Sequence, residues 1–191
     1  MRKSILLAAA LSVGFVGTLN TFDIDPVHSN IGFKVRHLGI SSVNGSFTDY
    51  VATATVDPAD LSTLKAEAVI QVASVDTGVE RRDNHLRSDD FFNAEAHPTI
   101  TFVSTGVRNI DGSKFELVGD LTIRETTKEI VFAGEFLGQA MMRGKTVVAF
   151  EAEARINRLE FGLKWDALTE AGGLMVGDEV RLMLELEAAA Q

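Results

Sequence analysis

The sequence predicts an all-β protein of eight or nine antiparallel strands with one short helical insertion. Apolar and polar residues alternate through most of the chain, and Ile31, Phe33, Val35 and His37 fall on one face of a strand while the residues between them fall on the other. Turn residues separate these segments at hairpin spacing, which is typical of a closed barrel or a sandwich. A parallel α/β fold is disfavoured because helical segments do not alternate with the strands.

The strands follow from the alternation and from the breaks between its segments. Pro26 ends a short opening strand, and Asn109-Ile110-Asp111-Gly112 is a hairpin signal because Asp-Gly readily adopts the positive φ of a tight turn. β-Branched and aromatic residues support the strand at 47–57. The strands expected are residues 22–25, 30–38, 47–57, 65–74, 99–105, 115–124, 129–137, 145–157 and 179–188.

The helical insertion is expected at residues 79–88. Thr77 and Glu80 have the spacing of a capping box, and Asp83 and Arg87 are four residues apart, so they can pair on the helix surface. The adjacent Phe91 and Phe92 follow in a polar segment. They indicate either a lid or plug over the apolar interior, or simple anchoring of a long connection in the core.

The composition limits the classes of partner. The 191 residues suffice for one domain with a sizeable core. The formal net charge is −9 and no basic run is present, which disfavours nucleic-acid binding. The absence of cysteine excludes disulfides, thiolate metal sites and a cysteine nucleophile. Twelve phenylalanines against one Trp and one Tyr suit a dry interior.

Residues 1–20 are predicted to be a signal peptide, and residues 21–191 the mature domain. Arg2 and Lys3 precede an uncharged, mostly apolar stretch at 5–17, which is too short to span a bilayer of about 30 Å. Val16 and Thr18 match a signal-peptide cleavage site only in part. The alternative interpretation of this segment is an apolar N-terminal helix or an uncleaved anchor. No other run is long enough for a membrane span, and the mature domain is expected to be soluble.

No catalytic or metal-binding motif is present. The four histidines, His28, His37, His85 and His97, do not have zinc-site spacing, and no serine lies in a nucleophile elbow. Paired carboxylates at 89–90 are interpreted as solvated, and no glycine-rich phosphate loop is found. We therefore expect no enzyme activity, no metal and no cofactor. His37 shares the apolar strand face and needs a polar partner, either a buried backbone group or the polar end of a ligand.

Several short segments, taken in order, resemble one family. They are DPVHS (25–29), FKVRHLG (33–39), VNGSF (43–47), DTG (76–78), RDNHLRS (82–88), DFF (90–92), Pro98, GDLTI (119–123), TK (127–128), FG (161–162), Trp165 and VGDEV (176–180). Over about residues 22–187 the chain is similar to the YceI-like family of bacterial periplasmic proteins. The resemblance implies an extended, lipocalin-like antiparallel barrel around an apolar tunnel. It also implies export to the periplasm and binding of a long amphiphilic lipid, above all a polyisoprenoid or isoprenoid quinone.

The residues predicted to line this tunnel are mostly aromatic or aliphatic. They are Ile31, Phe33, Val35, His37, Phe91, Phe92, Phe102, Leu121, Ile123, Phe132, Phe136, Phe150 and Trp165. The main hypothesis is a lipid carrier or store. The alternatives are a filled-core stress or partner-binding protein, or an enzyme acting on a lipid or quinone with His37 or His85 as acid–base. A homodimer stays open.

Overall fold

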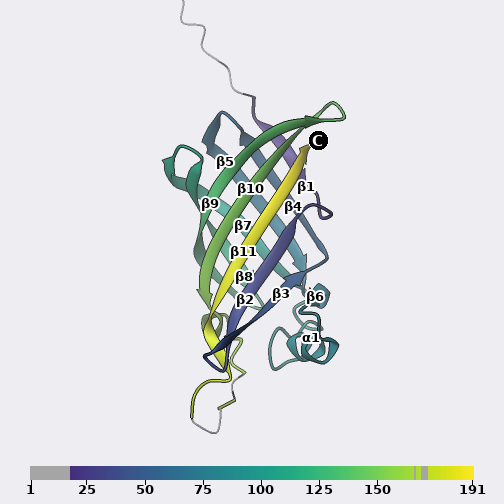
Figure 1. Cartoon of the computed structure of the whole chain (residues 1–191), viewed down its shortest axis with the longest axis vertical. Helices are drawn as coiled ribbons and strands as arrows, with labels where there is room; N and C mark the ends of the chain where they lie inside the picture. The colour runs from purple at the N-terminus through teal and green to yellow at the C-terminus, as the bar shows by residue number, and fades with distance from the viewer. Residues whose placement is uncertain (1–17, 166, 169–171) are drawn as a thin grey trace, which may run out of the picture.

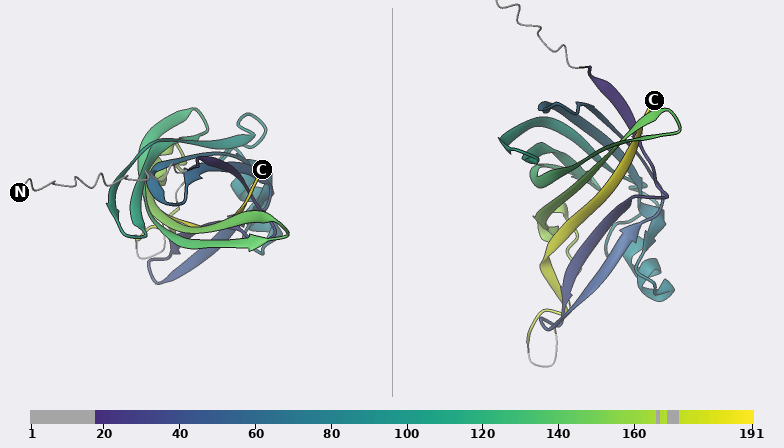
Figure 2. Two further views of the ribbon diagram at one scale, coloured as in Figure 1. Left: turned by 90° about the horizontal axis from the view of Figure 1, so that it is seen from above. Right: turned by 45° about the horizontal axis from the view of Figure 1, so that its top comes forward.

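Eight strands close into an antiparallel barrel. The structure is a computed structural model that describes residues 18–165, 167, 168 and 172–191. The ring closes because β1 pairs with both β4 and β11 (Figures 1 and 2). In order around the ring, its strands are β1 (Asn20–Ile24), β4 (Tyr50–Asp57), β5 (Asp60–Gln71), β7 (Thr99–Asp111), β8 (Lys114–Ile123), β9 (Thr126–Met142), β10 (Lys145–Asn157) and β11 (Val176–Ala190).

Strand β11 is shared between two partners on its free side. Near the C-terminus it pairs with β1, and nearer its start it pairs with β2 (Asn30–His37), as in Leu184 opposite Ile31. From β2 the wall continues through β3 (Ser41–Phe47) to β6 (Val75–Asp76). The barrel therefore has a terminal end, where β1 begins and β11 finishes. The opposite end of the barrel carries α1 (Glu80–Arg87) and the β2–β3 turn, and we call it the helix end (Figure 1).

Glycines inside the strands make room for inward-pointing phenylalanines on neighbouring strands. A Cβ atom added at any of these glycines would overlap the adjacent ring, so the ring lies directly on the glycine backbone. This explains why glycine interrupts the apolar alternation of β8 and β9. The pairs are Phe33 on Gly45, Phe102 on Gly119 and Phe115 on Gly134.

The helical insertion forms as expected, but two predicted contacts within it are wrong. The N-cap residue is Val79, with no side-chain cap, because the Thr77 hydroxyl donates instead to the Asp83 carboxylate (2.5 Å). Asp83 is buried and also accepts from the Thr77 N–H, so it does not pair with Arg87 on the surface. Arg87 donates to the Ala73 and Val75 carbonyls and ties α1 to the barrel.

The strand bounds differ from the sequence expectation mainly at strand ends. β10 has the predicted bounds, whereas β3 was not foreseen, β9 runs on to Met142, and β11 begins three residues earlier than expected. The strand expected to end at residue 137 continues through Gly138, which pairs with Ala149 beside a bulge between Ala149 and Phe150. Short 3₁₀ turns occupy Val72–Ser74 (η1) and Arg158–Phe161 (η2).

The predicted signal peptide lies mostly outside the described residues, which begin at Thr18. Within the expected range 1–20, Asn20 already belongs to β1 and pairs with Val56. In the part of the chain that the structure describes, no helix is both long and apolar enough to span a membrane.

Candidate functional site: an apolar cavity inside the barrel

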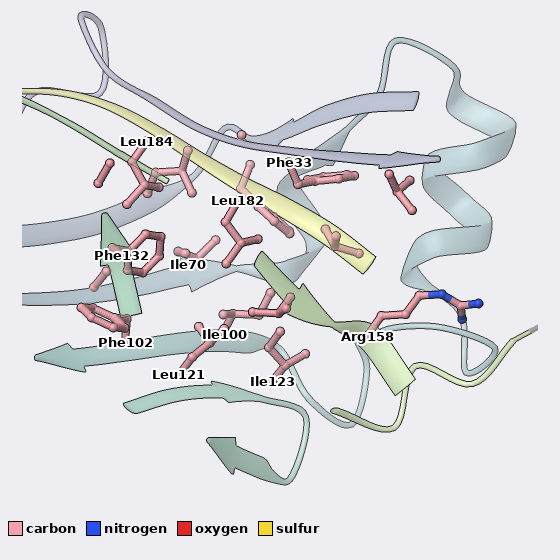
Figure 3. Close-up of a pocket in the computed structure, with 18 of the residues that line it drawn as sticks. Phe33, Ile70, Ile100, Phe102, Leu121, Ile123, Phe132, Arg158, Leu182 and Leu184 are labelled. Atoms are coloured by element: carbon pink, nitrogen blue, oxygen red, sulfur yellow. The ribbon is translucent and has the colours of Figure 1, made fainter. Parts of the chain in front are cut away.

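The barrel encloses a cavity of about 400 Å³. Its wall combines residues of ten strands with α1 and the loops next to it. Figure 3 shows Phe33 of β2, Ile70 of β5, and Leu182 and Leu184 of β11 directed into this space. A volume of this size is in the usual range for small-molecule sites, which are mostly apolar with few polar groups.

The cavity exists because one side of the barrel carries small side chains. The inward positions of β4 and β5 that line it include Ala52, Ala54, Ala66 and Ala68, whose methyl groups reach only a short way into the barrel. The inward residues of β11 include leucines at 182, 184 and 186, which all line the cavity and are only partly buried. Their exposed surface borders the empty space rather than the outside.

The terminal end is packed with side chains. Phe22, Val56, Val148 and Ala188 are each at most 1% exposed and come from strands that meet where the barrel closes. This cluster leaves no room for a guest. The cavity therefore extends from it toward the helix end.

Aromatic and basic side chains line the helix end of the cavity. The His85 ring meets the Phe91 and Trp165 rings edge-on, with centroids 5.1 and 5.0 Å away. Its Nε2 is 2.8 Å from the Asp90 carboxylate, which fixes the ring orientation. The guanidinium of Arg82, also on α1, lies on the same wall and donates to the Thr77 hydroxyl and carbonyl.

Arg158 is a buried structural residue at this end. It is 2% exposed, and all of its side-chain nitrogens donate, so the guanidinium is saturated by the protein. These bonds tie the end of β10 to the start of β11 across the intervening loop (Figure 3 shows the side chain). The acceptors are the carbonyls of Leu163, Trp165, Val176 and Gly177 and the carboxylate of Asp178.

Comparison with known proteins decides the family. The YceI-like domain matches residues 22–188. The chain belongs to the YceI-like family. A Staphylococcus epidermidis relative of this YceI-like protein, UPF0312 protein SERP2314, is 39% identical over 175 residues, which are 91% of this chain and 97% of the relative. The Campylobacter jejuni YceI protein is 33% identical, with a TM-score of 0.72 over 100% of this chain and 99% of the other.

A more distant structure shares the fold alone. A polyisoprenoid binding domain from Saccharophagus degradans matches with a TM-score of 0.63 at 15% identity, covering 91% of this chain and 100% of that domain. The extended antiparallel barrel predicted from the family resemblance is confirmed.

All but one of the predicted tunnel residues of this YceI-like protein line the cavity. The exception is Phe136, whose ring packs on that of Phe150 with centroids 5.2 Å apart. Phe91 and Phe92 border the cavity at the α1 end, and His37 borders it from β2. Contact between these residues and a ligand stays a prediction.

Sequence reasoning missed several lining residues of the YceI-like barrel. The inward leucines of β11 were visible in the apolar alternation but were not chosen as candidates, and Ile70 and Ile100 have the same signature. Arg82 and Arg158 carried no signal, because nothing local shows that a basic residue borders an apolar cavity.

A polar cluster lies on the barrel wall, away from the cavity lining. The donor atoms of Asp25, His28 and Glu187 lie within 4.8 Å of one another, close enough to share a cation. However, His28 Nδ1 is 2.8 Å from the Asp25 carboxylate, so these two groups satisfy each other without an ion. This hydrogen bond raises the pKa of His28 and lowers that of Asp25, with the charge of Glu187 adding to the rise. The cluster therefore joins the β1–β2 turn to β11.

Proposed function

We propose that this protein binds a long-chain amphiphilic lipid in the barrel cavity, for carriage or storage in the periplasm. A polyisoprenoid or isoprenoid quinone is the leading ligand class. The observation that carries the proposal is the unfilled, almost wholly apolar interior of about 400 Å³. Membership of the YceI-like family and the fold shared with a polyisoprenoid binding domain support the same ligand class.

The cavity volume sets the amount of lipid that can be buried. An apolar cavity of about 150 Å³ holds one benzene molecule, so on this scale 400 Å³ holds about fifteen carbons, or three isoprene units. At about 0.8 kcal/mol per buried CH₂ equivalent, these carbons contribute about 12 kcal/mol before the costs of ordering the lipid. Binding on this scale needs no catalytic group and no metal.

The polar side chains at the helix end suit the head of such a lipid. His37, Arg82 and His85 border the cavity there, whereas the terminal end is closed by apolar packing. A lipid would therefore place its chain among the phenylalanines and alanines and its head toward α1. We expect the head to accept hydrogen bonds, since arginine has only donors to offer.

The deciding experiment is the identification of the bound molecule. The protein is produced in its native host, purified without detergent, extracted with organic solvent and examined by mass spectrometry. About one prenyl lipid per chain supports the proposal, and its absence from every preparation contradicts it. Sequencing the N-terminus of protein recovered from the periplasmic fraction tests the export step, because removal of roughly twenty residues is expected.

A pair of charge substitutions tests the position of the ligand. Phe33→Asp places a carboxylate on the cavity wall and should abolish lipid retention or folding. Val51→Asp is the matched control, because Val51 is 72% exposed on the outer face of β4. If folded Phe33→Asp protein carries as much lipid as the Val51→Asp control, the ligand does not lie against this wall.

A further inference from the structure

The β2–β3 turn presents a leucine where glycine or asparagine is favoured. Leu38 and Gly39 have φ values of 55° and 72°, and the Ile40 N–H bonds to the His37 carbonyl (3.3 Å), as in a type I′ turn. Asn-Gly is the preferred pair there, because a bulky side chain in the left-handed region is strained. Among the described residues, Leu38 is the only apolar side chain with a positive φ. It is also 41% exposed, so neither conformation nor burial explains it.

Leu38 belongs to a cluster of exposed apolar side chains on two joined loops. Its N–H donates to the Met175 carbonyl (2.9 Å), and Leu168 forms an isolated bridge with Leu174 in the loop before β11. We call Leu38, Ile40, Leu168 and Leu174 the docking tip; the last three are 84%, 65% and 39% exposed. Single exposed apolar residues are ordinary, but such a group at one end of a protein marks an interaction site.

Basic side chains lie on the outer wall directly beside the docking tip. A shallow groove across β10, β11, β2 and β3 is lined by four basic side chains and one acidic one, in a chain whose formal net charge is −9; the charged residues are Lys34, Arg36, Arg155, Arg181 and Glu179. Arg155 and Arg181 pair with Glu179 and Glu153, while Lys34 and Arg36 form no ion pair with another described residue. Arg36 and Lys34 precede Leu38 by two and four residues, or about 7 and 13 Å along the strand.

The cavity reaches the same end of the barrel. His37 and Met175, which adjoin the docking-tip residues Leu38 and Leu174, line the cavity. Insertion of the docking tip into a bilayer would therefore place this end of the cavity next to the lipid chains. Apolar tips enter the headgroup region by about 5–10 Å, a depth at which Arg36 and Lys34 would meet lipid phosphates.

We propose that the helix end of the barrel docks on a lipid bilayer, with the docking tip inserted and Lys34 and Arg36 giving a preference for anionic lipids. The inference rests on the proposed function, because docking serves lipid exchange between membrane and cavity. Because the chain as a whole is acidic, with a formal net charge of −9, insertion of the apolar side chains supplies the main attraction and the two cations supply the preference.

Co-sedimentation with vesicles of phosphatidylcholine and phosphatidylglycerol in equal parts tests the docking. Ile40→Asp should lower the partition coefficient about tenfold or more, since it replaces an inserted apolar side chain by a charge. Leu38→Asn should lower partition severalfold yet raise the thermal midpoint, because asparagine suits the turn. The matched control is Val27→Asp, at an 82% exposed site in the β1–β2 turn, and it should bind as the wild type does.

The charge preference has its own comparison. Lys34→Gln with Arg36→Gln should weaken partition onto the mixed vesicles and leave partition onto pure phosphatidylcholine unchanged. Equal binding of Ile40→Asp and wild type overturns the docking proposal. Mass spectrometry of the same preparations keeps the two proposals apart. Bound lipid without vesicle partition refutes docking alone, and vesicle partition without bound lipid refutes the carrier function alone.

Discussion

Replacing Ala68 by leucine tests whether the interior is open. Ala68 lies on β5, pairs with Ala52 on β4 and lines the cavity. Leucine adds three carbons to the inward side chain. If these carbons enter empty space, they bury apolar surface and raise the free energy of unfolding of the lipid-free protein by about 2 kcal/mol. If the interior is filled, the same carbons overpack it and lower that free energy by about 1–3 kcal/mol.

The sign of the change in the free energy of unfolding therefore distinguishes an open interior from a filled one. Ala154→Leu is the control. Ala154 is an inward alanine of β10 that is 4% exposed and packed in the core rather than on the cavity wall. Leucine at this position is expected to destabilise by about 1–3 kcal/mol. The two variants carry the same chemical change and differ only in the space around it.

Thermal unfolding of protein stripped of lipid by solvent extraction and refolded provides the measurement. For a chain of this size, 2 kcal/mol corresponds to a shift of about 4–8 °C, upward for Ala68→Leu and downward for Ala154→Leu. Ala68→Leu should also take up less lipid, because its side chain occupies ligand space. Equal destabilisation by both variants would refute the cavity and with it the lipid-carrier hypothesis.

Three further results are expected. Gly119→Ala should lower the free energy of unfolding in urea by about 1–3 kcal/mol, because the new methyl overlaps the Phe102 ring; an unchanged midpoint would show that the ring moves aside. Arg158→Met should lower the free energy of unfolding by about 3–5 kcal/mol and speed hydrogen exchange at residues 176–178, since it leaves buried carbonyls unpaired. Unaltered exchange there would show that Arg158 does not hold the start of β11 in place. The bond between His28 and Asp25 should stabilise the fold fully between pH 3.8 and 6.5, the ordinary pKa values of the two groups. That contribution is lost as the pH rises through the raised pKa of His28 or falls through the lowered pKa of Asp25. The melting temperatures of wild type and His28→Gln should therefore differ between pH 3.8 and 6.5 and converge in alkali. A difference that stays constant with pH would contradict stabilisation by the His28–Asp25 bond.

Local patterns predicted the features that depend on local physics. Strand β10 has the bounds expected from its alternation, because side chains of a strand alternate whatever lies beyond it. The capping box at Thr77 failed because a tertiary contact took over its hydroxyl: Asp83 is buried and binds it. Similarly, the Arg158 side chain bonds to residues up to twenty positions away, and no sequence spacing predicts such a contact.

The sequence alone determined which face of each strand is apolar, and its ordered motifs indicated the family. Whether the enclosed space is filled was decided only by the tertiary structure. That outcome depends on which side chains the closed ring brings to a common interior, here the alanines of β4 and β5 and the leucines of β11. A cavity is the difference between the volume a closed wall encloses and the volume its side chains occupy. Neither quantity is a property of any one segment of the chain.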